Sequence, residues 1–563
     1  MRPATVSRLT MAVAALVCAL LALQPPTAEA ASYTKISGAG STWSSNALDQ
    51  WRRNVSSNSG MTVNYQAVGS SVGREQFKNG TADFAVSEIP YGLTEGGMRD
   101  APPKRGYAYM PIVAGGTAFM YNLRIGGKKV TNLRLSGEVL TKIFTGRITM
   151  WNAAEIRSDN PGLNLPARRV IPVVRSDGSG TTAQLTTWMA REHGGLWDDY
   201  CRRAGRSTPC GMTSYFPVVP GSSHIAKSGS LGVSGYTKQG HAEGAITYVE
   251  YSYAMNTGFP VAKMLNASGY YVEPTASSVA VALMKARINE DENSENYLTQ
   301  ILDGVYRSAD RRTYPLSSYS YMVVPTTTEQ PFTQAKGRTL ATFANYFLCD
   351  GQQQAEELGY SPLPKNLVEA GFAQVRRIPG APTGGIDIKK CRNPTFSPDG
   401  SNTLAKRAPY PKACDKRGPQ QCADGTAGAR EQTRVNPGAS GGGSGSSGGT
   451  GSGSGGASGG TTTAGSSGGG TSGTDGTSGG TAGSSAGGVI DPDTGELISD
   501  DSGGAGDSSV VGNPVTLAAG DSLGLRGVLM ALSAVLLLGV VVGPPLAARA
   551  LAARGRRKGG SLR

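Results

Sequence analysis

The chain of 563 residues contains only three histidines, and none of its seven cysteines forms a Cys-x-x-Cys pair. The usual spacing of a zinc site is therefore missing. The glycine-rich stretches also lack the lysine of a P-loop and the last glycine of a dinucleotide-binding fingerprint, which argues against ATP and NAD. We expect no metal and no cofactor.

The chain also lacks a recognisable nucleic-acid-binding motif, although it is basic. It has 54 Lys and Arg residues against 41 Asp and Glu residues, for a formal net charge of +13, and part of this charge lies in the two termini. The remaining positive charge is compatible with an anion-binding body but does not identify one. We expect no nucleic-acid partner.

What the chain does have is three predicted helix starts that are rich in glycine and hydroxyl residues. The stretch 175–182 (RSDGSGTT) follows an apolar strand-like run, 170–174, and precedes a helical pattern, 183–190. Two similar stretches, 37–43 and 68–73, precede helical patterns at 46–55 and 74–78. The second follows an alternating, strand-like run at 61–67, and a further strand-like run lies at 84–87. Free backbone N–H groups and the helix dipole favour a small oxyanion at such helix starts, although the same residue types are also ordinary helix caps.

Four segments together resemble the ligand segments of the periplasmic phosphate-binding proteins, the receptors of bacterial phosphate ABC transporters. They are Gly38–Trp43, Gly69–Ser71, Asp83–Pro90 and Arg175–Thr181. The order and approximate spacing agree, and so do the segments 144–152, 160–163, 245–251 and 359–364. The resemblance covers residues 36 to 378 and implies an α/β fold of type II periplasmic-binding proteins, with two lobes and a ligand cleft between them.

Carried over position by position, the resemblance implies a phosphate site. The implied ligand residues are Thr42, Trp43, Ser70, Glu88, Arg175, Ser179, Gly180 and Thr181, and Asp177 would support Arg175. The family usually has Phe at the position of Trp43 and Asp at the position of Glu88. In the family, that carboxylate accepts a hydrogen bond from the proton of the bound phosphate and thereby rejects sulfate. Because Glu88 is longer by one methylene, the preference for phosphate over sulfate is open for this chain.

The two ends of the chain predict an exported, membrane-tethered protein. Residues 1–30 have a basic start, an apolar core and the sequence Ala-Glu-Ala before Ala31, as in a secretory signal peptide. Residues 527–548 are uncharged and long enough to span a bilayer, and five basic residues follow at 549–558. Since positive residues stay cytoplasmic, we expect a single-pass protein of the cell membrane with its body outside the cytoplasm.

Between the body and the predicted span lies a tether in which nearly half of residues 438–488 are glycine. Such a sequence cannot bury a core and behaves as a disordered coil. The predicted organisation is a signal peptide (1–30), lobe 1 (33–110 and 313–395), lobe 2 (111–312), a Cys-containing extension (396–436), the Gly/Ser-rich linker (437–522), a transmembrane helix (525–548) and a basic cytoplasmic tail (549–563).

Six cysteines remain after the predicted signal peptide is removed, and an even number in an exported protein indicates disulfides. Close spacing favours Cys201–Cys210 and Cys414–Cys422, which leaves Cys349–Cys391. This is one of about fifteen possible pairings, and a zinc site is the alternative.

The prediction is therefore a monomeric, non-enzymatic receptor that captures inorganic phosphate and passes it to the permease and ATPase subunits of an ABC transporter. One alternative is a surface module that senses or holds an anion without feeding a transporter. Another is a serine hydrolase, because 69–73 (GSSVG) fits the Gly-x-Ser-x-Gly elbow with Ser71 as nucleophile. Its base would have to be His193, His224 or His241.

Overall fold

The computed structural model describes residues 33–435, except for 96, 295, 385 and 386. The predicted signal peptide, linker, transmembrane helix and tail lie outside the described residues. Within them, no helix combines the length and the apolarity that a bilayer span needs.

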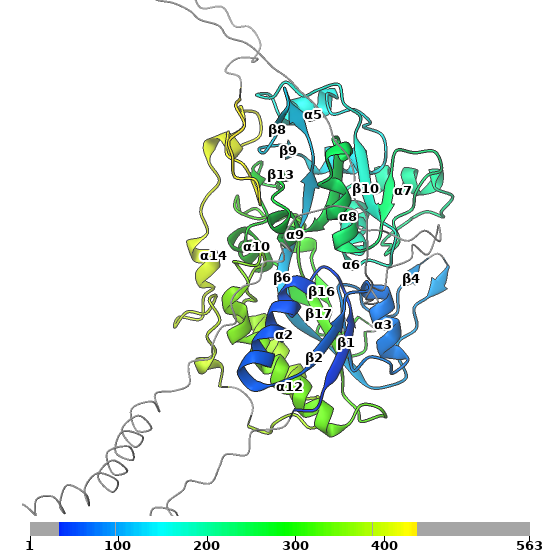
Figure 1. Cartoon of the computed structure of the whole chain (residues 1–563), viewed down its shortest axis with the longest axis vertical. Helices are drawn as coiled ribbons and strands as arrows, with labels where there is room; N and C mark the ends of the chain where they lie inside the picture. Colours follow the sequence, from blue (N-terminus) through cyan, green and yellow to red (C-terminus); the bar gives the residue numbers. More distant parts are fainter. Residues whose placement is uncertain (1–32, 96, 295, 385–386, 436–563) are drawn as a thin grey trace, which may run out of the picture. The chain divides into compact units, whose positions relative to one another are not determined.

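One mixed β-sheet runs through the body and links two lobes (Figure 1). Along its main path the strands are β11 (Ile225–Lys227), β10 (Ile171–Arg175), β12 (Ala245–Glu250), β6 (Tyr107–Tyr121), β17 (Ser317–Pro325), β3 (Phe84–Ser87), β1 (Ile36–Gly40) and β2 (Val63–Gln66). Three further strands continue it beside β6, namely β13 (Val261–Leu265), β14 (Tyr271–Val272) and β9 (Arg134–Leu135).

The two long central strands carry the chain from one lobe to the other. The first part of β6 pairs with β17, from Tyr107 to Gly116, and its last part pairs with β12, from Thr117 to Tyr121. On one side, β1 pairs in parallel with β2 and β3; on the other, β10 pairs in parallel with β11 and β12. We call the part built on β1–β3 the first lobe and the part built on β10–β12 the second lobe.

Helices pack on both lobes. Figure 1 shows α2 and α12 beside β1 and β2, and α6 and α8 near β10. The helices are α2 (Ser45–Ser59), α3 (Ser70–Lys78), α4 (Gly137–Phe144), α5 (Ala154–Asp159), α6 (Gly180–Glu192), α7 (Gly194–Arg203), α8 (Gly229–Thr237), α9 (Tyr251–Asn256), α10 (Ala276–Leu283), α11 (Asp303–Tyr306), α12 (Gln334–Leu348), α13 (Lys365–Val375) and α14 (Thr403–Arg407). Short two-stranded pairs are β4 (Thr94–Glu95) with β5 (Met98–Arg99), β7 (Arg124–Ile125) with β8 (Lys128–Lys129), and β15 (Arg287–Ile288) with β16 (Gln300–Ile301).

The helices and strands expected around the glycine-rich stretches are present. The helical pattern at 46–55 lies in α2, and the strand-like runs at 61–67, 84–87 and 170–174 contain or overlap β2, β3 and β10. Helix α3 begins at Ser70, four residues before the helical pattern, and α6 begins at Gly180. Ser70 and Ser71 therefore belong to the first turn of α3, and Thr181 and Thr182 to the first turn of α6, which Ser179 caps.

All three predicted disulfides are present. Cys201–Cys210 joins α7 to the loop that follows it, Cys349–Cys391 joins the end of α12 to the chain that leaves the first lobe, and Cys414–Cys422 closes a loop of the extension. The extension packs on the second lobe through partly buried polar contacts. Arg134 donates to the carbonyl oxygens of Cys414 at 2.8 Å and Pro419 at 3.0 Å, and Lys263 pairs with Asp415 at 2.7 Å.

Candidate functional site

The three glycine-rich helix starts meet where the two lobes touch. In the first lobe, β1 leads into α2 and β2 leads into α3; in the second lobe, β10 leads into α6. The backbone N–H of Gly180 donates across the interface to Ser70 Oγ at 3.2 Å, and the N–H of Ser71 donates to the carbonyl oxygen of Gly178 at 3.1 Å. The N-termini of α3 and α6 are thus in direct contact.

Glycine makes this close approach possible. Gly69, which precedes α3, has a positive φ of 92°, and a Cβ there would come within 2.8 Å of an Asp177 carboxylate oxygen. A Cβ on Gly180 would lie 1.8 Å from Glu88 Oε2. A side chain at either position would push the two lobes apart.

Arg175 lies at the end of β10 with its guanidinium almost fully buried, at 2% side-chain exposure. Its Nε donates to Asp177 Oδ1 at 2.7 Å, and one Nη donates to Asp177 Oδ2. The N–H of Gly229 also donates to Asp177 Oδ1, at 2.9 Å. Asp177 thus holds one edge of the guanidinium, while the remaining nitrogen, Nη1, makes only a long contact of 3.5 Å with Ser230 Oγ among the described residues. Arg175 therefore keeps donor capacity for an anion.

The charge state of Asp177 follows from this pairing. Burial by itself raises the pKa of this carboxyl, but the hydrogen bonds and charge of Arg175 and the N–H of Gly229 outweigh burial and hold the pKa below its usual range. Asp177 is thus ionised at neutral pH, and its charge offsets part of the charge of Arg175. The site can then bind an anion without an excess of buried positive charge in the unliganded protein.

Glu88, at the end of β3, is 2% exposed and sits among three serine hydroxyls, which we call the hydroxyl cage: Ser41, Ser70 and Ser320. Oε1 accepts from Ser41 Oγ at 2.7 Å and from Ser320 Oγ at 2.5 Å. Oε2 accepts from Ser70 Oγ at 2.9 Å. The carboxylate therefore turns toward the helix starts and is held by donors, as an anionic acceptor in a buried site requires.

The first turn of α6 presents the remaining second-lobe candidates. Ser179 caps the helix, because its Oγ accepts from the N–H of Thr182 at 3.2 Å. Thr181 is 1% exposed, and its Oγ1 has no hydrogen-bond partner in the described part of the chain. A buried hydroxyl without a partner is costly unless a ligand or water completes it, so Thr181 points to a polar occupant at this helix start.

Thr42 and Trp43 lie at the start of α2. Thr42 Oγ1 is 2.8 Å from Ser230 Oγ of the second lobe. The N–H of Trp43, expected as a ligand donor, donates instead to Ser41 Oγ at 3.0 Å. The Trp43 N–H is therefore occupied by Ser41. It would donate to a ligand only if the ligand replaced Ser41 Oγ as its acceptor.

The structure thus brings Thr42, Trp43, Ser70, Glu88, Arg175, Ser179, Gly180 and Thr181 to the junction of the three helix starts. It adds three residues that sequence reasoning did not single out: Ser41, Ser230 and Ser320. Ser41 lies within the stretch 38–43 and could have been included from its position. Ser230 and Ser320 are 188 and 232 residues away from their partners Thr42 and Glu88, and no local pattern marks them.

The contacts of Ser71 do not resemble those of a hydrolase nucleophile. Its Oγ donates to Ser214 Oγ at 3.3 Å. His224 is bonded to Ser222 and to the carbonyl oxygen of Phe144, His193 packs on Trp188, and His241 packs on Tyr236. Within residues 33–435, apart from the four omitted positions, no group of three or more His, Cys, Asp or Glu side chains could hold a metal ion.

Comparisons with known proteins place this chain among binding proteins. Residues 25–351 match the profile of the PBP superfamily domain. The phosphate-binding protein PstS of Xylella fastidiosa is 32% identical over 345 residues, which cover 61% of this chain and 86% of that protein. The phosphate-binding protein PstS of Haemophilus influenzae is 28% identical over 338 residues, covering 60% of this chain and 91% of its own. A solved periplasmic phosphate-binding protein, PfluDING with bound phosphate, is 18% identical with a TM-score of 0.45, and covers 63% of this chain and all of its own.

Proposed function

The chain belongs to the PBP superfamily and, within it, to the PstS-type phosphate-binding proteins, and on this basis we propose that it captures inorganic phosphate outside the cytoplasm for uptake by an ABC transporter. It is a binding protein and not an enzyme. Acting as a monomer, it delivers phosphate to the permease and ATPase subunits of that transporter.

The observation that carries this proposal is that hydrogen-bond donors and a buried carboxylate acceptor lie together at the junction of the helix starts. Arg175, the start of α6 and the hydroxyl of Thr181 are donors suited to an oxyanion. Glu88 is a buried carboxylate, and while ionised it can only accept hydrogen bonds. A protonated phosphate offers both acceptors and a donor, whereas sulfate has no proton for Glu88 at neutral pH.

We assign the ligand contacts to Thr42, Trp43, Ser70, Glu88, Arg175, Ser179, Gly180 and Thr181, with Asp177 supporting Arg175. Ser70 and Gly180 come from opposite lobes and already share a hydrogen bond, which supports a ligand held at the lobe junction. Phosphate would exchange some of these internal bonds for its own oxygens, for instance the bond between Trp43 N–H and Ser41.

Calorimetric titration of the full chain in detergent with phosphate, arsenate and sulfate tests the ligand assignment. The proposal expects one site that binds phosphate and arsenate and discriminates against sulfate. Equal affinity for sulfate and phosphate, or no binding of phosphate, would contradict it.

We further propose that the protein is a single-pass protein of the cell membrane. The composition of residues 1–30, 437–522, 525–548 and 549–563 supports a cleaved signal peptide, a flexible linker with an end-to-end distance of about 50 Å, a membrane span and a basic cytoplasmic tail. We assign the lobes to 33–110 with 313–395 and to 111–312, and this division is supported by the change of partner along β6, from β17 to β12. The extension, 396–436, connects the lobes to the linker.

Proteolysis of intact, wall-stripped cells tests this topology. Protease should cut the linker and release a soluble fragment that still binds phosphate. A body that remains protected in such cells, or that leaves them without protease, would contradict the proposed anchor.

A further inference from the structure

Glu88 has two carboxylate oxygens in different surroundings, and this difference bears on how the proposed phosphate site discriminates between anions. Oε1 accepts from two serine hydroxyls, whereas Oε2 accepts from one, Ser70. A carboxylate has about four acceptor positions in all. With Oε1 filled by Ser41 and Ser320, one position remains, and it lies on Oε2.

The direction of Oε2 fits a ligand-facing role. A Cβ on Gly180 would stand 1.8 Å from Oε2 and 2.7 Å from Ser70 Oγ, so Oε2 faces the backbone of the first residue of α6. An anion bound at the start of α6 would therefore meet Oε2 and not Oε1.

Ser41 can supply its only proton to Glu88. Its Oγ accepts the N–H of Trp43 at 3.0 Å, so its own O–H is left to donate to Oε1 at 2.7 Å. The Trp43 N–H thereby sets the direction of this hydroxyl until phosphate takes that N–H, and the O–H of Ser41 can still donate to Oε1 afterwards.

Ser320 is aimed at Glu88 by an irregularity in β17. The register of β17 against β6 shifts between Ser320 and Tyr321, as it does at a β-bulge, and bulges re-aim side chains. Gln300 holds the neighbouring residue in place, because its side chain bonds both backbone groups of Tyr319, at 3.1 Å each. Ser320 itself is fully buried, and its hydroxyl donates to the Glu88 carboxylate.

We propose that Ser41 and Ser320 are positioning residues that saturate Oε1 of Glu88 and so leave Oε2 as the single acceptor for a ligand proton. This rests on the proposed phosphate function. It explains how a glutamate can take the place of a shorter carboxylate: the hydroxyl cage draws the longer side chain back, and Gly180 leaves it room.

The test is the ratio of phosphate affinity to sulfate affinity in the full chain, measured by calorimetric competition. Ser320→Ala frees an acceptor position on Oε1 and lets the carboxylate turn, so the ratio should fall by about tenfold, the effect of one hydrogen bond to a charged group. Ser320→Thr keeps the hydroxyl and should keep the ratio. Ser41→Ala acts on the same oxygen and should lower the ratio too.

Ser317→Ala is the matched control, because Ser317 is also buried in β17 and its hydroxyl donates to the carbonyl oxygen of Tyr314 at 2.8 Å and not to Glu88. It should leave the ratio unchanged. If Ser320→Ala and Ser41→Ala lower the affinities for phosphate and sulfate by the same factor, or change neither affinity, the positioning role is wrong even though the wild type prefers phosphate. A wild type that does not bind phosphate would instead refute the proposed function.

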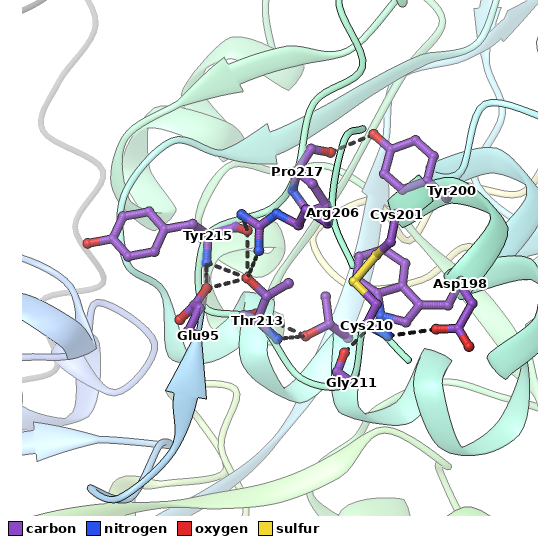
Figure 2. Close-up of a disulfide and its surroundings, with 12 residues drawn as sticks. Glu95, Asp198, Tyr200, Cys201, Arg206, Cys210, Gly211, Thr213, Tyr215 and Pro217 are labelled. Atoms are coloured by element: carbon purple, nitrogen blue, oxygen red, sulfur yellow. Dashed lines mark hydrogen bonds between the residues drawn. A yellow bond between two sulfur atoms is a disulfide. The ribbon is translucent and has the colours of Figure 1, made fainter. Parts of the chain in front are cut away.

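A second observation concerns a contact between the lobes beside the anion site, where the N–H of Ser179 donates to the carbonyl oxygen of Ser214 at 3.0 Å. Glu95, in the β4–β5 hairpin of the first lobe, inserts its carboxylate into the loop 213–215 of the second lobe (Figure 2). Oε1 accepts the consecutive N–H groups of Ser214 at 2.7 Å and Tyr215 at 2.9 Å, and it also accepts the hydroxyl of Thr213. Oε2 accepts from Ser214 Oγ at 2.5 Å. Consecutive N–H groups of this kind form an anion-binding nest.

The loop that forms the nest is fixed to the second lobe by several contacts. The disulfide Cys201–Cys210 ties its loop to α7, and Trp197 Nε1 donates to the carbonyl oxygen of Gly211 at 2.8 Å. Arg206 donates to Thr213 Oγ1 at 3.0 Å and to the carbonyl oxygen of Tyr215 at 3.3 Å (Figure 2). By contrast, the hairpin that carries Glu95 has strands of two residues each. The loop 213–215 is thus held in place within the second lobe, whereas the hairpin is small. Such a pair suits a contact that can form and break.

We infer that Glu95 and its nest form a clasp that holds the two lobes closed. Resonance energy transfer between fluorophores on engineered cysteines at the exposed positions Ser57 in the first lobe and Arg202 in the second measures the lobe separation in the full chain without added phosphate. Glu95→Ala and Glu95→Gln should lengthen the mean separation, and should raise the rate of phosphate release on the order of tenfold.

Glu75→Gln is the control, because Glu75 is a glutamate of the first lobe whose ion pair, with Lys78, lies within α3. It should change neither quantity. An unchanged separation in both Glu95 variants would refute the clasp, and this readout does not depend on which anion the protein binds.

Discussion

Removing the Arg175 guanidinium should weaken phosphate binding strongly. Its side chain is 2% exposed, so the charge acts in a desolvated environment where a hydrogen bond to a charged group is not replaced by water. Arg175→Ala removes that donor and leaves the buried Asp177 carboxylate without its ion-pair partner beside the incoming anion. We expect a loss of about 2–4 kcal/mol, which corresponds to a Kd roughly 30- to 1,000-fold higher.

Two companion variants separate the causes of that loss. In the double variant Arg175→Ala with Asp177→Asn, the unpaired carboxylate is gone, so part of the affinity should return. Arg175→Lys keeps the charge but not the planar fork that pairs with both oxygens of Asp177, and it should bind phosphate more weakly than the wild type.

Calorimetric titration with phosphate measures all three variants, and circular dichroism checks that each is folded. Wild-type affinity in Arg175→Ala would remove Arg175 from the site and refute the ligand assignment built on β10 and α6.

Three further predictions concern stability and the extension. Because Arg175 holds the pKa of Asp177 below its usual range, the pair stabilises the fold above the ordinary aspartate pKa and loses this effect as the pH falls through the folded value. The Tm difference between wild type and Asp177→Asn should therefore be largest near neutral pH and shrink in acid; a difference that grows in acid would contradict the pairing. Replacing Cys349 and Cys391 by alanine opens a loop of 42 residues and should lower the free energy of unfolding by about 2–4 kcal/mol in urea titrations, with phosphate still bound by the folded fraction. Arg134→Ala removes the donors to Cys414 and Pro419 and should expose the extension to limited proteolysis, whereas Arg124→Ala, at an exposed position of β7, should not.

Much of the fold around the site can be predicted from local sequence patterns. Helical spacing at 46–55 and alternation at 61–67 arise from contacts within one element and its adjacent core, so α2 and β2 are visible in the sequence. Glycines beside hydroxyl residues mark the starts of α3 and α6 because those backbones must approach each other closely. The pairing of Arg175 with Asp177 joins residues two positions apart.

The hydroxyl cage and the clasp could not be predicted in this way. Ser320 contacts Glu88 only because β17 returns beside β3 and is irregular at that residue, and Glu95 meets the loop 213–215 only when the lobes come together. The direction of the Trp43 N–H toward Ser41 depends on the local backbone of the α2 start, which a family resemblance does not specify. Contacts of this kind depend on the folding of distant segments onto one another.

The most direct test of the central claim is a calorimetric comparison of phosphate and sulfate binding by the wild type and Glu88→Gln. A neutral amide supplies a donor and removes the negative charge, so sulfate should bind measurably better and phosphate more weakly than in the wild type. That result would identify the carboxylate in the hydroxyl cage as the group that selects a protonated anion. An equal phosphate-over-sulfate preference in both proteins would contradict this role and leave the anion site resting on Arg175 and the helix starts.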